Sequence, residues 1–288
     1  MSDHIPSLAD LRREIDVLDD QIQDLLRRRA EAVQRVAETK RTEGGSDGVF
    51  LRPGREAQIL RRLLERHRTG LPPAALLRIW REMISSLYDL QAPVKVAVHA
   101  PNKSAARWDL ARDFYGSTTP MQLCTTATAV IRAVNSQPAT LGVMAMPEDG
   151  EKEVWWPLLA SRAEDTPRII ARLPFVPNPR GRIAELGCYV IARTPPEESG
   201  EDCTLIVVYM NEDASSVARL NSLLAQAGLE SRVLAQHRGT SGVARMLVEV
   251  TGFVPDSDDR MAAFRAADPN LISDAVVIGA YPVPVAES

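Results

Sequence analysis

A long amphipathic segment near the start of the chain constrains its fold more than any other feature. From Ser7 to about Arg41 the sequence contains neither glycine nor proline. Apolar residues recur along it at alternating spacings of three and four: Leu8, Leu11, Ile15, Leu18, Ile22 and Leu25. This period is typical of a helix that carries one narrow apolar seam. The segment is therefore predicted to form a single long helix.

Two shorter helices are predicted after it. The segment EGGSDGVFLRPG breaks the first helix, and Pro53 stands at a favourable first position for a second helix that runs to His67. After a second break, RTGLPP, a third helix is predicted from Pro72 to Gln91. Residues 1–92 are thus expected to form a helical domain.

Beyond Pro93 the pattern changes to apolar strands that alternate with helices. VKVAVHA, MQLCTT and TLGVMAM are separated by helical segments, which indicates a parallel α/β sheet, and GCYVIAR is interpreted as a strand that returns to it. After TPPEESGED, interpreted as a linker, the element order becomes βαββαβ, that of a small ferredoxin-like sandwich. We therefore expect a multidomain α plus α/β protein with domains at 1–92, 93–196 and 203–288.

Composition argues against several functional classes. A net charge of −4 over 288 residues provides no overall basic field for nucleic acid. No apolar run approaches the roughly 20 residues that cross a bilayer, and the N-terminus lacks a signal-peptide core, so we expect no membrane partner and a cytoplasmic location. The 3 cysteines (Cys124, Cys188 and Cys203) are too scattered for a disulfide framework or a zinc site, and the 4 histidines do not cluster. We expect no metal and no cofactor.

The informative residues are polar side chains at positions where the helical period calls for apolar ones. Continuing the first seam beyond Leu25 leads to Arg29 and then to Lys40. At about 100° per residue these two cations lie within roughly 20° of each other around the axis and about 16 Å apart along it. Glu56 and Gln91 occupy the apolar faces of the second and third helices in the same way.

Spacing alone leaves two interpretations open for these polar and charged residues on the apolar faces of the helices. In the first, Arg29 and Lys40 extend to the surface and Glu56 pairs with one of them. In the second, cations, one carboxylate and one amide line a pocket that orients a dianion without covalent chemistry. Arg12 lies 28 residues before Lys40 in the sequence, about 42 Å along a continuous helix. Arg12 therefore contributes to one small pocket with Lys40 only across a dimer.

The strings LADLRREIDVLDDQIQDLLRRRAEAVQRVAETK, RPGREAQILRRL and WREMISSLYDLQ closely resemble the all-helical class of chorismate mutase. The resemblance covers about residues 7–92. It implies an intertwined homodimer whose two long helices pair, with Arg12 donated to the partner's pocket. The pocket's own residues would be Arg29, Lys40, Arg55, Glu56 and Gln91.

The reaction that the resemblance implies is the rearrangement of chorismate to prephenate in aromatic amino-acid biosynthesis. Arg12 and Arg29 would hold the two substrate carboxylates, and Lys40 and Gln91 would donate to the ether oxygen as its bond to carbon breaks. Glu56 would accept from the ring hydroxyl, with Arg55 as a nearby supporting charge. Two positions depart from the family pattern, because Leu87 replaces a frequent serine and Arg52 an aspartate of some members.

Residues 94–285 resemble, more weakly, the prephenate dehydratase and ACT-like regions of fused mutase/dehydratase enzymes. The dehydratase Thr-Arg-Phe signature is absent, since Leu186, Gly187 and Cys188 occupy its place, and the region is too short for two full lobes. The ACT motif that binds phenylalanine is not matched, so an amino-acid effector is left open. We expect a chorismate mutase with a structural or regulatory C-terminal region. The alternatives are a bifunctional mutase/dehydratase and a non-catalytic metabolite sensor.

Overall fold

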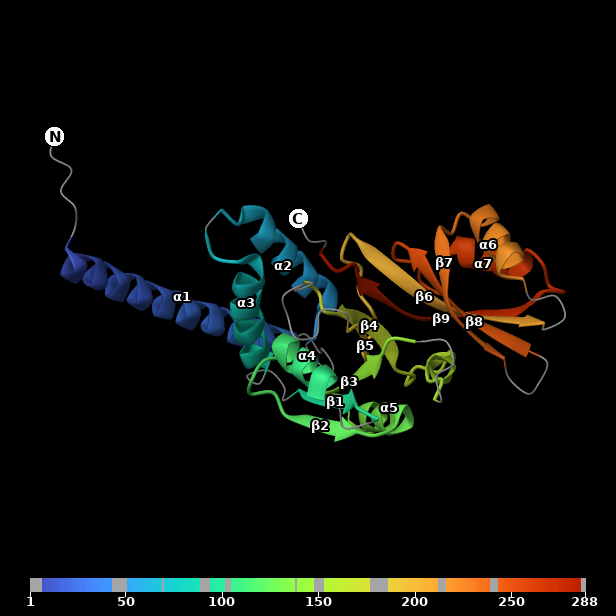
Figure 1. Ribbon diagram of the computed structural model, residues 1–288, viewed down its shortest axis with the longest axis horizontal. Coiled ribbons are helices and arrows are strands. Elements are labelled where there is room, and N and C mark those ends of the chain that lie inside the picture. The colour runs from blue at the N-terminus through green and yellow to red at the C-terminus, as the bar shows by residue number, and fades with distance from the viewer. Residues whose placement is uncertain are drawn as a thin grey trace.

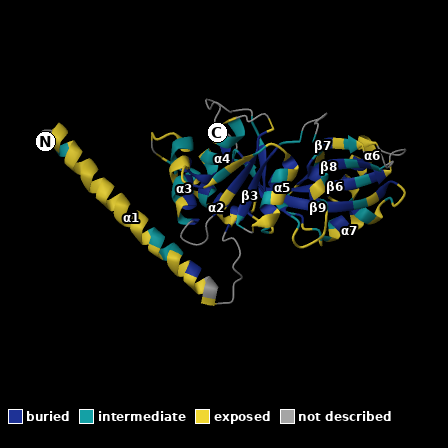
Figure 2. Ribbon diagram, turned by 90° about the horizontal axis from the view of Figure 1, so that it is seen from below, coloured by how far each residue is buried: buried dark blue, intermediate teal, exposed yellow. Residues whose placement is uncertain are grey.

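A computed structural model describes residues 7–42, 51–68, 70–88, 94–101, 105–137, 139–147, 153–176, 186–211, 216–238 and 243–285. Within these residues, three N-terminal helices precede a mixed sheet with four further α-helices (Figure 1). The expectation of a multidomain α plus α/β protein is confirmed. The long first helix projects away from the remainder of the molecule (Figures 1 and 2).

The three N-terminal helices are α1 (Leu8–Thr42), α2 (Pro53–Arg66) and α3 (Pro73–Tyr88). Helix α1 begins at a reciprocal cap, in which the Asp10 amide donates to Ser7 Oγ at 3.2 Å and the Ser7 amide donates to Asp10 Oδ2 at 3.1 Å. Pro53 opens α2, as predicted, because a first-turn residue has no intrahelical use for an amide hydrogen. The predicted single long helix and the second helix are confirmed, and the third is confirmed as far as Tyr88.

The next region contains a parallel core, followed by strands that return antiparallel. Its elements are β1 (Lys95–His99), α4 (Ala105–Tyr115), β2 (Met121–Cys124), α5 (Ala127–Ser136), β3 (Thr140–Ala145), the 3-10 helix η1 (Trp156–Leu159), β4 (Arg168–Leu173) and β5 (Cys188–Ala192). Strand β1 pairs in parallel with β2 and β3, while β5 runs antiparallel to β3 and β4. The parallel sheet and the returning strand are as predicted. Strand β4 was not predicted.

The last region has the predicted βαββαβ order. Its elements are β6 (Asp202–Asn211), α6 (Val217–Gln226), β7 (Ser231–Arg238), β8 (Val243–Thr251), α7 (Asp259–Ala266) and β9 (Ile272–Pro282). Apolar side chains of α6 and α7, including Leu220, Leu224 and Phe264, pack with Ile206 and Val248 from one face of these strands.

The strands of both regions form one sheet in the described part of the chain. Its order is β2-β1-β3-β5-β4-β9-β6-β8-β7, and β4 meets β9 in parallel at Ile169 and Gly279. A side chain at Gly279 would place its Cβ 2.2 Å from the Ile169 carbonyl oxygen, so only glycine permits this approach. A single apolar core, which includes Trp155, Trp156 and Leu247, spans the two regions.

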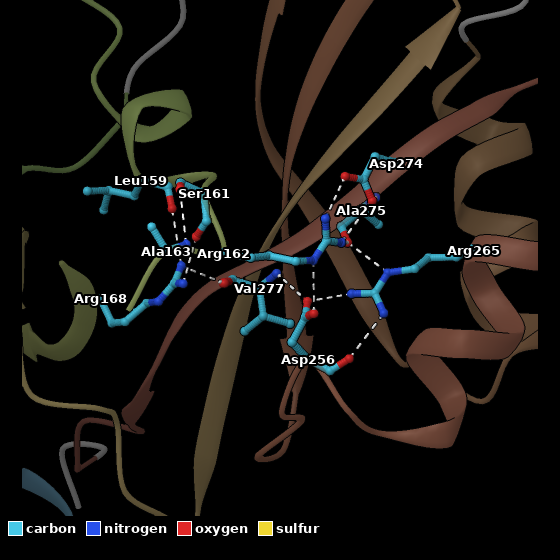
Figure 3. Close-up of polar contacts among 10 residues, drawn as sticks. All are labelled: Leu159, Ser161, Arg162, Ala163, Arg168, Asp256, Arg265, Asp274, Ala275 and Val277. Atoms are coloured by element: carbon cyan, nitrogen blue, oxygen red, sulfur yellow. Dashed lines mark hydrogen bonds and ion pairs between the residues drawn. The ribbon is translucent and has the colours of Figure 1, made fainter. Parts of the chain in front are cut away.

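Polar contacts reinforce the junction between these two regions. Arg162, in the segment between η1 and β4, binds both carboxylate oxygens of Asp274 at 2.9 Å and also pairs with Asp256 at 3.3 Å (Figure 3). Arg265 of α7 contacts the same Asp256. Ser199, within the segment interpreted as a linker, is buried and its amide donates to Asp202 at 2.8 Å. This segment is therefore packed structure rather than a free linker.

Candidate active site

The predicted mutase residues on α1 lie along a helix whose apolar seam is exposed. Leu8, Leu11, Ile15, Leu18, Ile22 and Leu25 are all exposed in the single chain. Arg12 is exposed as well, whereas Arg29 is half-buried and its Nη1 atom is buried without a hydrogen-bond partner. Burial lowers the pKa of the Arg29 guanidinium. Lys40 belongs to α1, but its side chain lies outside the described residues, as does all of Gln91.

Glu56 is buried against α3. It stands in the first turn of α2, is 7% exposed and forms an ion pair with Arg81 of α3 through its Oε2 atom. Its Oε1 atom is buried and has no hydrogen-bond partner. The described partner of Glu56 is thus Arg81 and not Arg29, one of the two cations that the surface interpretation of the seam charges offered.

Arg81, the partner of Glu56, was not singled out from the sequence. Its guanidinium carbon lies 3.6 Å from the ring centroid of Phe114 on α4, and its Nε donates to the Phe114 carbonyl at 2.7 Å. Arg81 falls four residues after Leu77 and three before Ile84, both buried. The signal that singled out Glu56, a charge on an apolar stripe, was therefore present for Arg81 too.

The space beside Glu56 is small. A cavity of about 20 Å³ adjoins it, lined also by Leu51, Ala57, Tyr115 and Phe175. A cavity of that size holds about one water molecule. Burial raises the pKa of the Tyr115 hydroxyl, so this tyrosine is neutral at physiological pH. Among the described residues, the cavity beside Glu56 is therefore smaller than a substrate with a six-membered ring.

The remaining predicted residues lie on the surface of α2 or along α3. Arg55 is exposed, and its Nη1 lies 3.4 Å from Gln58 Oε1. Arg52, one of the two departures from the family pattern, pairs with Glu197. Leu87, the other departure, is partly buried near the end of α3. Among the described residues, no hydrogen bond or ion pair joins Arg12, Arg29 or Arg55 to Glu56.

A second polar group lies at the carboxyl end of β1. His99 is buried, neither of its ring nitrogens has a hydrogen-bond partner, and its Nε2 is 3.9 Å from Glu153. Glu153 accepts from the amides of Ala127 and Thr128 at 2.9 and 3.2 Å, which places a carboxylate at the N-terminus of α5. The histidines do not cluster in the sequence, but the fold brings His99 beside this carboxylate.

Two opposing influences set the charges of this second group. Burial, followed by the nearby Arg107, lowers the pKa of His99, although Glu153 opposes the shift. Burial alone would raise the pKa of Glu153, but hydrogen bonds from Ala127 and Thr128 lower it overall. His99 is therefore neutral and Glu153 charged near pH 7. Among the described residues, no group of three or more His, Cys, Asp or Glu side chains is arranged to hold a metal.

The architecture is thus a helical domain joined to a mixed α/β sheet, with a buried carboxylate–guanidinium pair at the junction. Residues 11–92 match the family model of chorismate mutase type II. The N-terminal helices are a chorismate mutase domain of this type. Among the described residues, none of the helices combines the length and apolar character needed to cross a bilayer.

Relatives with this domain are larger, bifunctional proteins. The bifunctional chorismate mutase/prephenate dehydratase of Stutzerimonas stutzeri is 38% identical over 96 residues, which is 33% of this chain and 26% of that protein. The protein of the same name from Aquifex aeolicus is 32% identical over 141 residues, which is 48% of this chain and 38% of that protein. The chain thus spans well under half the length of either relative.

Among solved structures, the chain is similar to prephenate dehydratase from Arthrobacter aurescens, solved in complex with L-Phe. The TM-score is 0.46 and the sequence identity 13%, and the match covers 68% of this chain and 93% of that chain.

Proposed function

We propose that this protein is a chorismate mutase that converts chorismate to prephenate in its helical domain. The observation that carries the proposal is the match of residues 11–92 to the chorismate mutase type II family. The reaction is a pericyclic rearrangement, so the protein needs to orient a flexible dianion and stabilise charge on one oxygen, and no nucleophile is required. Its product enters aromatic amino-acid biosynthesis.

The active form in this proposal is a homodimer in which two copies of α1 pair along the apolar seam. The exposure of this seam in one chain supports the pairing, because a row of large apolar side chains is stabilised by burial against a partner. Arg12 of one chain reaches the pocket of the other. The single chain's cavity of about 20 Å³ beside Glu56 is consistent with a pocket that only the pair completes.

The proposed roles follow the chemistry of each side chain. Arg12 of the partner and Arg29 bind the two substrate carboxylates through charge-assisted hydrogen bonds, which fix the reactive conformer. Lys40 and Gln91 donate to the ether oxygen, where negative charge develops. Glu56 accepts from the ring hydroxyl through its unpartnered Oε1 atom, and Arg55 supports the site's positive charge.

The α/β region, with its ACT-like C-terminal part, is proposed to have a structural or regulatory role. A second candidate function is a bifunctional mutase/dehydratase. It is favoured by the Aquifex relative, whose 141 matched residues exceed the length of the helical domain. A cytoplasmic location and an amino-acid effector remain predictions.

Incubating the purified full-length protein with chorismate and analysing the products tests the proposal. Prephenate as the sole product is expected, and the rate should scale with enzyme concentration. Phenylpyruvate would favour the bifunctional alternative instead. Unchanged chorismate would contradict both enzymatic proposals and favour a metabolite sensor.

A further inference from the structure

We propose that Arg81 is a positioning residue of the mutase site and that α4 of the α/β region holds Arg81 in place. This inference rests on the proposed function and deepens it. It gives the α/β region a physical role in the chemistry of the helical domain.

The ion pair between Arg81 and Glu56 is almost completely removed from solvent. Glu56 is 7% exposed and Arg81 3%. Charges buried to this degree are stable only when paired, and the guanidinium of Arg81 lies directly against the Glu56 carboxylate. Loss of Arg81 would leave Glu56 buried without a compensating charge, and the carboxylate would rotate away from its present position.

The support for Arg81 comes from outside the helical domain. Phe114 contributes its ring face, 3.6 Å from the guanidinium carbon, and its backbone carbonyl, 2.7 Å from Arg81 Nε. A flat, delocalised cation makes both contacts at once, one above the ring and one in its own plane. Phe114 follows Arg81 by 33 residues and belongs to α4. The chain of contacts therefore runs from α4 through Arg81 to Glu56.

This arrangement leaves one carboxylate oxygen available. Arg81 Nη1 donates to Glu56 Oε2, while Oε1 is buried with no partner. A buried acceptor without a donor is costly, so a hydroxyl group delivered to it gains a full hydrogen bond. By binding Oε2, Arg81 fixes the orientation of the carboxylate and leaves Oε1 to face a ligand. Arg81 itself does not contact the substrate in this proposal.

A nearby pair on the same two helices provides a matched control. Arg78 of α3 pairs with Asp113 of α4, but these side chains are 63% and 49% exposed. Exposed pairs of this kind contribute little to stability. Arg78→Gln therefore removes an arginine from the same α3–α4 interface without touching Glu56.

The test measures kcat/KM for chorismate with purified wild-type protein and with Arg81→Gln, Phe114→Leu and Arg78→Gln. Arg81→Gln is expected to lower kcat/KM by about 10- to 100-fold, as is typical when a partner that orients a functional group is lost. Phe114→Leu keeps both charges and should give a smaller decrease. Arg78→Gln should remain within about twofold of wild type, as expected for an exposed pair. Circular dichroism establishes that each variant is folded.

A second substrate separates positioning from general structural support. With chorismate that lacks its ring hydroxyl, Glu56 has nothing to accept, so Arg81→Gln and Phe114→Leu should cause little or no decrease relative to wild type. Equal decreases with both substrates would overturn the inference, as would a folded Arg81→Gln protein with normal kcat/KM. If Arg81→Gln fails to fold, Phe114→Leu alone decides between these outcomes. Absence of turnover by the wild-type protein would contradict the proposed function itself, and this inference with it.

Discussion

At the scale of single residues, the fold buries several ionisable groups and their environments set their charges. Arg29, Glu56, Arg81 and His99 all carry a buried nitrogen or oxygen atom without a hydrogen-bond partner. Such atoms are rare in folded proteins because each one forfeits the hydrogen bonds it made to water. Three of these four residues, Arg29, Glu56 and Arg81, belong to the helical domain, and we place them in or beside the proposed mutase site. At the end of β1 such atoms belong to His99, which has no role in the proposed reaction.

His99 should make the stability of the protein depend on pH. Burial lowers its pKa below the ordinary 6.5, so the unfolded chain binds a proton more readily than the folded one. The free energy of unfolding should therefore decrease as the pH falls below about 6.5 and level off below the folded-state pKa. Urea denaturation of wild type and His99→Gln between pH 8 and pH 5 measures this, at values chosen to span the ordinary His pKa of about 6.5.

The variant should lose less stability over that range than wild type. Glu153 titrates in a separate window, since its pKa lies below the ordinary 4.5 and its contribution is lost only at more acidic pH. Parallel stability curves for wild type and His99→Gln would show that His99 does not carry the dependence.

At the scale of secondary-structure elements, the helices and strands that were predicted correctly are those with a regular apolar pattern. Helix α1 follows its seam from Leu8 to Thr42, and the βαββαβ order of the last region matches its alternating strands and helices. Strand β4 escaped prediction because two arginines interrupt its apolar run. Arg168 hydrogen-bonds to the carbonyl of Leu159 at 3.2 Å, 9 residues earlier, and to the carbonyl of Val277 at 3.1 Å, 109 residues later.

The candidate site was predicted only in part, because some of its contacts join residues that are far apart in the sequence. Charges on an apolar stripe mark Glu56 as buried, and the structure agrees. Arg81 carries the same signal, but its pairing with Glu56 of α2 and its support from Phe114 of α4 depend on contacts between residues far apart in the sequence, which no local pattern encodes. Lys40 and Gln91 remain predictions, because the side chain of the first and all of the second lie outside the described residues.

The junction between β4 and β9 should be sensitive to a single methyl group. Gly279→Ala would place a Cβ 2.2 Å from the Ile169 carbonyl oxygen at a φ of +149°, so the strands must separate or the backbone must strain. We expect the free energy of unfolding to fall by at least about 2 kcal/mol, combining overpacking and backbone strain.

Gly252→Ala is the matched control for this prediction. Gly252 also has a positive φ, +94°, but no other group lies within 4 Å of a Cβ there. Only backbone strain should therefore lower the free energy of unfolding of this variant, by about 1 kcal/mol. Equal losses in the two variants, measured by urea denaturation, would show that the close approach of the two strands is unimportant.

At the scale of the whole molecule, the helical domain divides into two parts with different attachments. Helices α2 and α3 are fixed to the body, for example through Arg61, which donates to the carbonyls of Glu201 and Val283 at 2.8 and 3.0 Å. Helix α1 instead projects outward and exposes its apolar seam (Figure 2). In the proposed dimer, the body holds Glu56 in place while α1 brings Arg12 to the partner.

Subunit mixing tests the shared site most directly. Arg12→Ala and Lys40→Ala proteins are each expected to lose chorismate mutase activity by about 10²-fold or more, because each loses a charged donor from both pockets. After the two are mixed under conditions of subunit exchange, a mixed dimer contains one pocket with both residues intact. Random exchange in equal amounts should restore about one quarter of the wild-type activity, since half of the dimers are mixed and each has one intact pocket of two. No recovery despite exchange demonstrated by native mass spectrometry would contradict a site built from two chains.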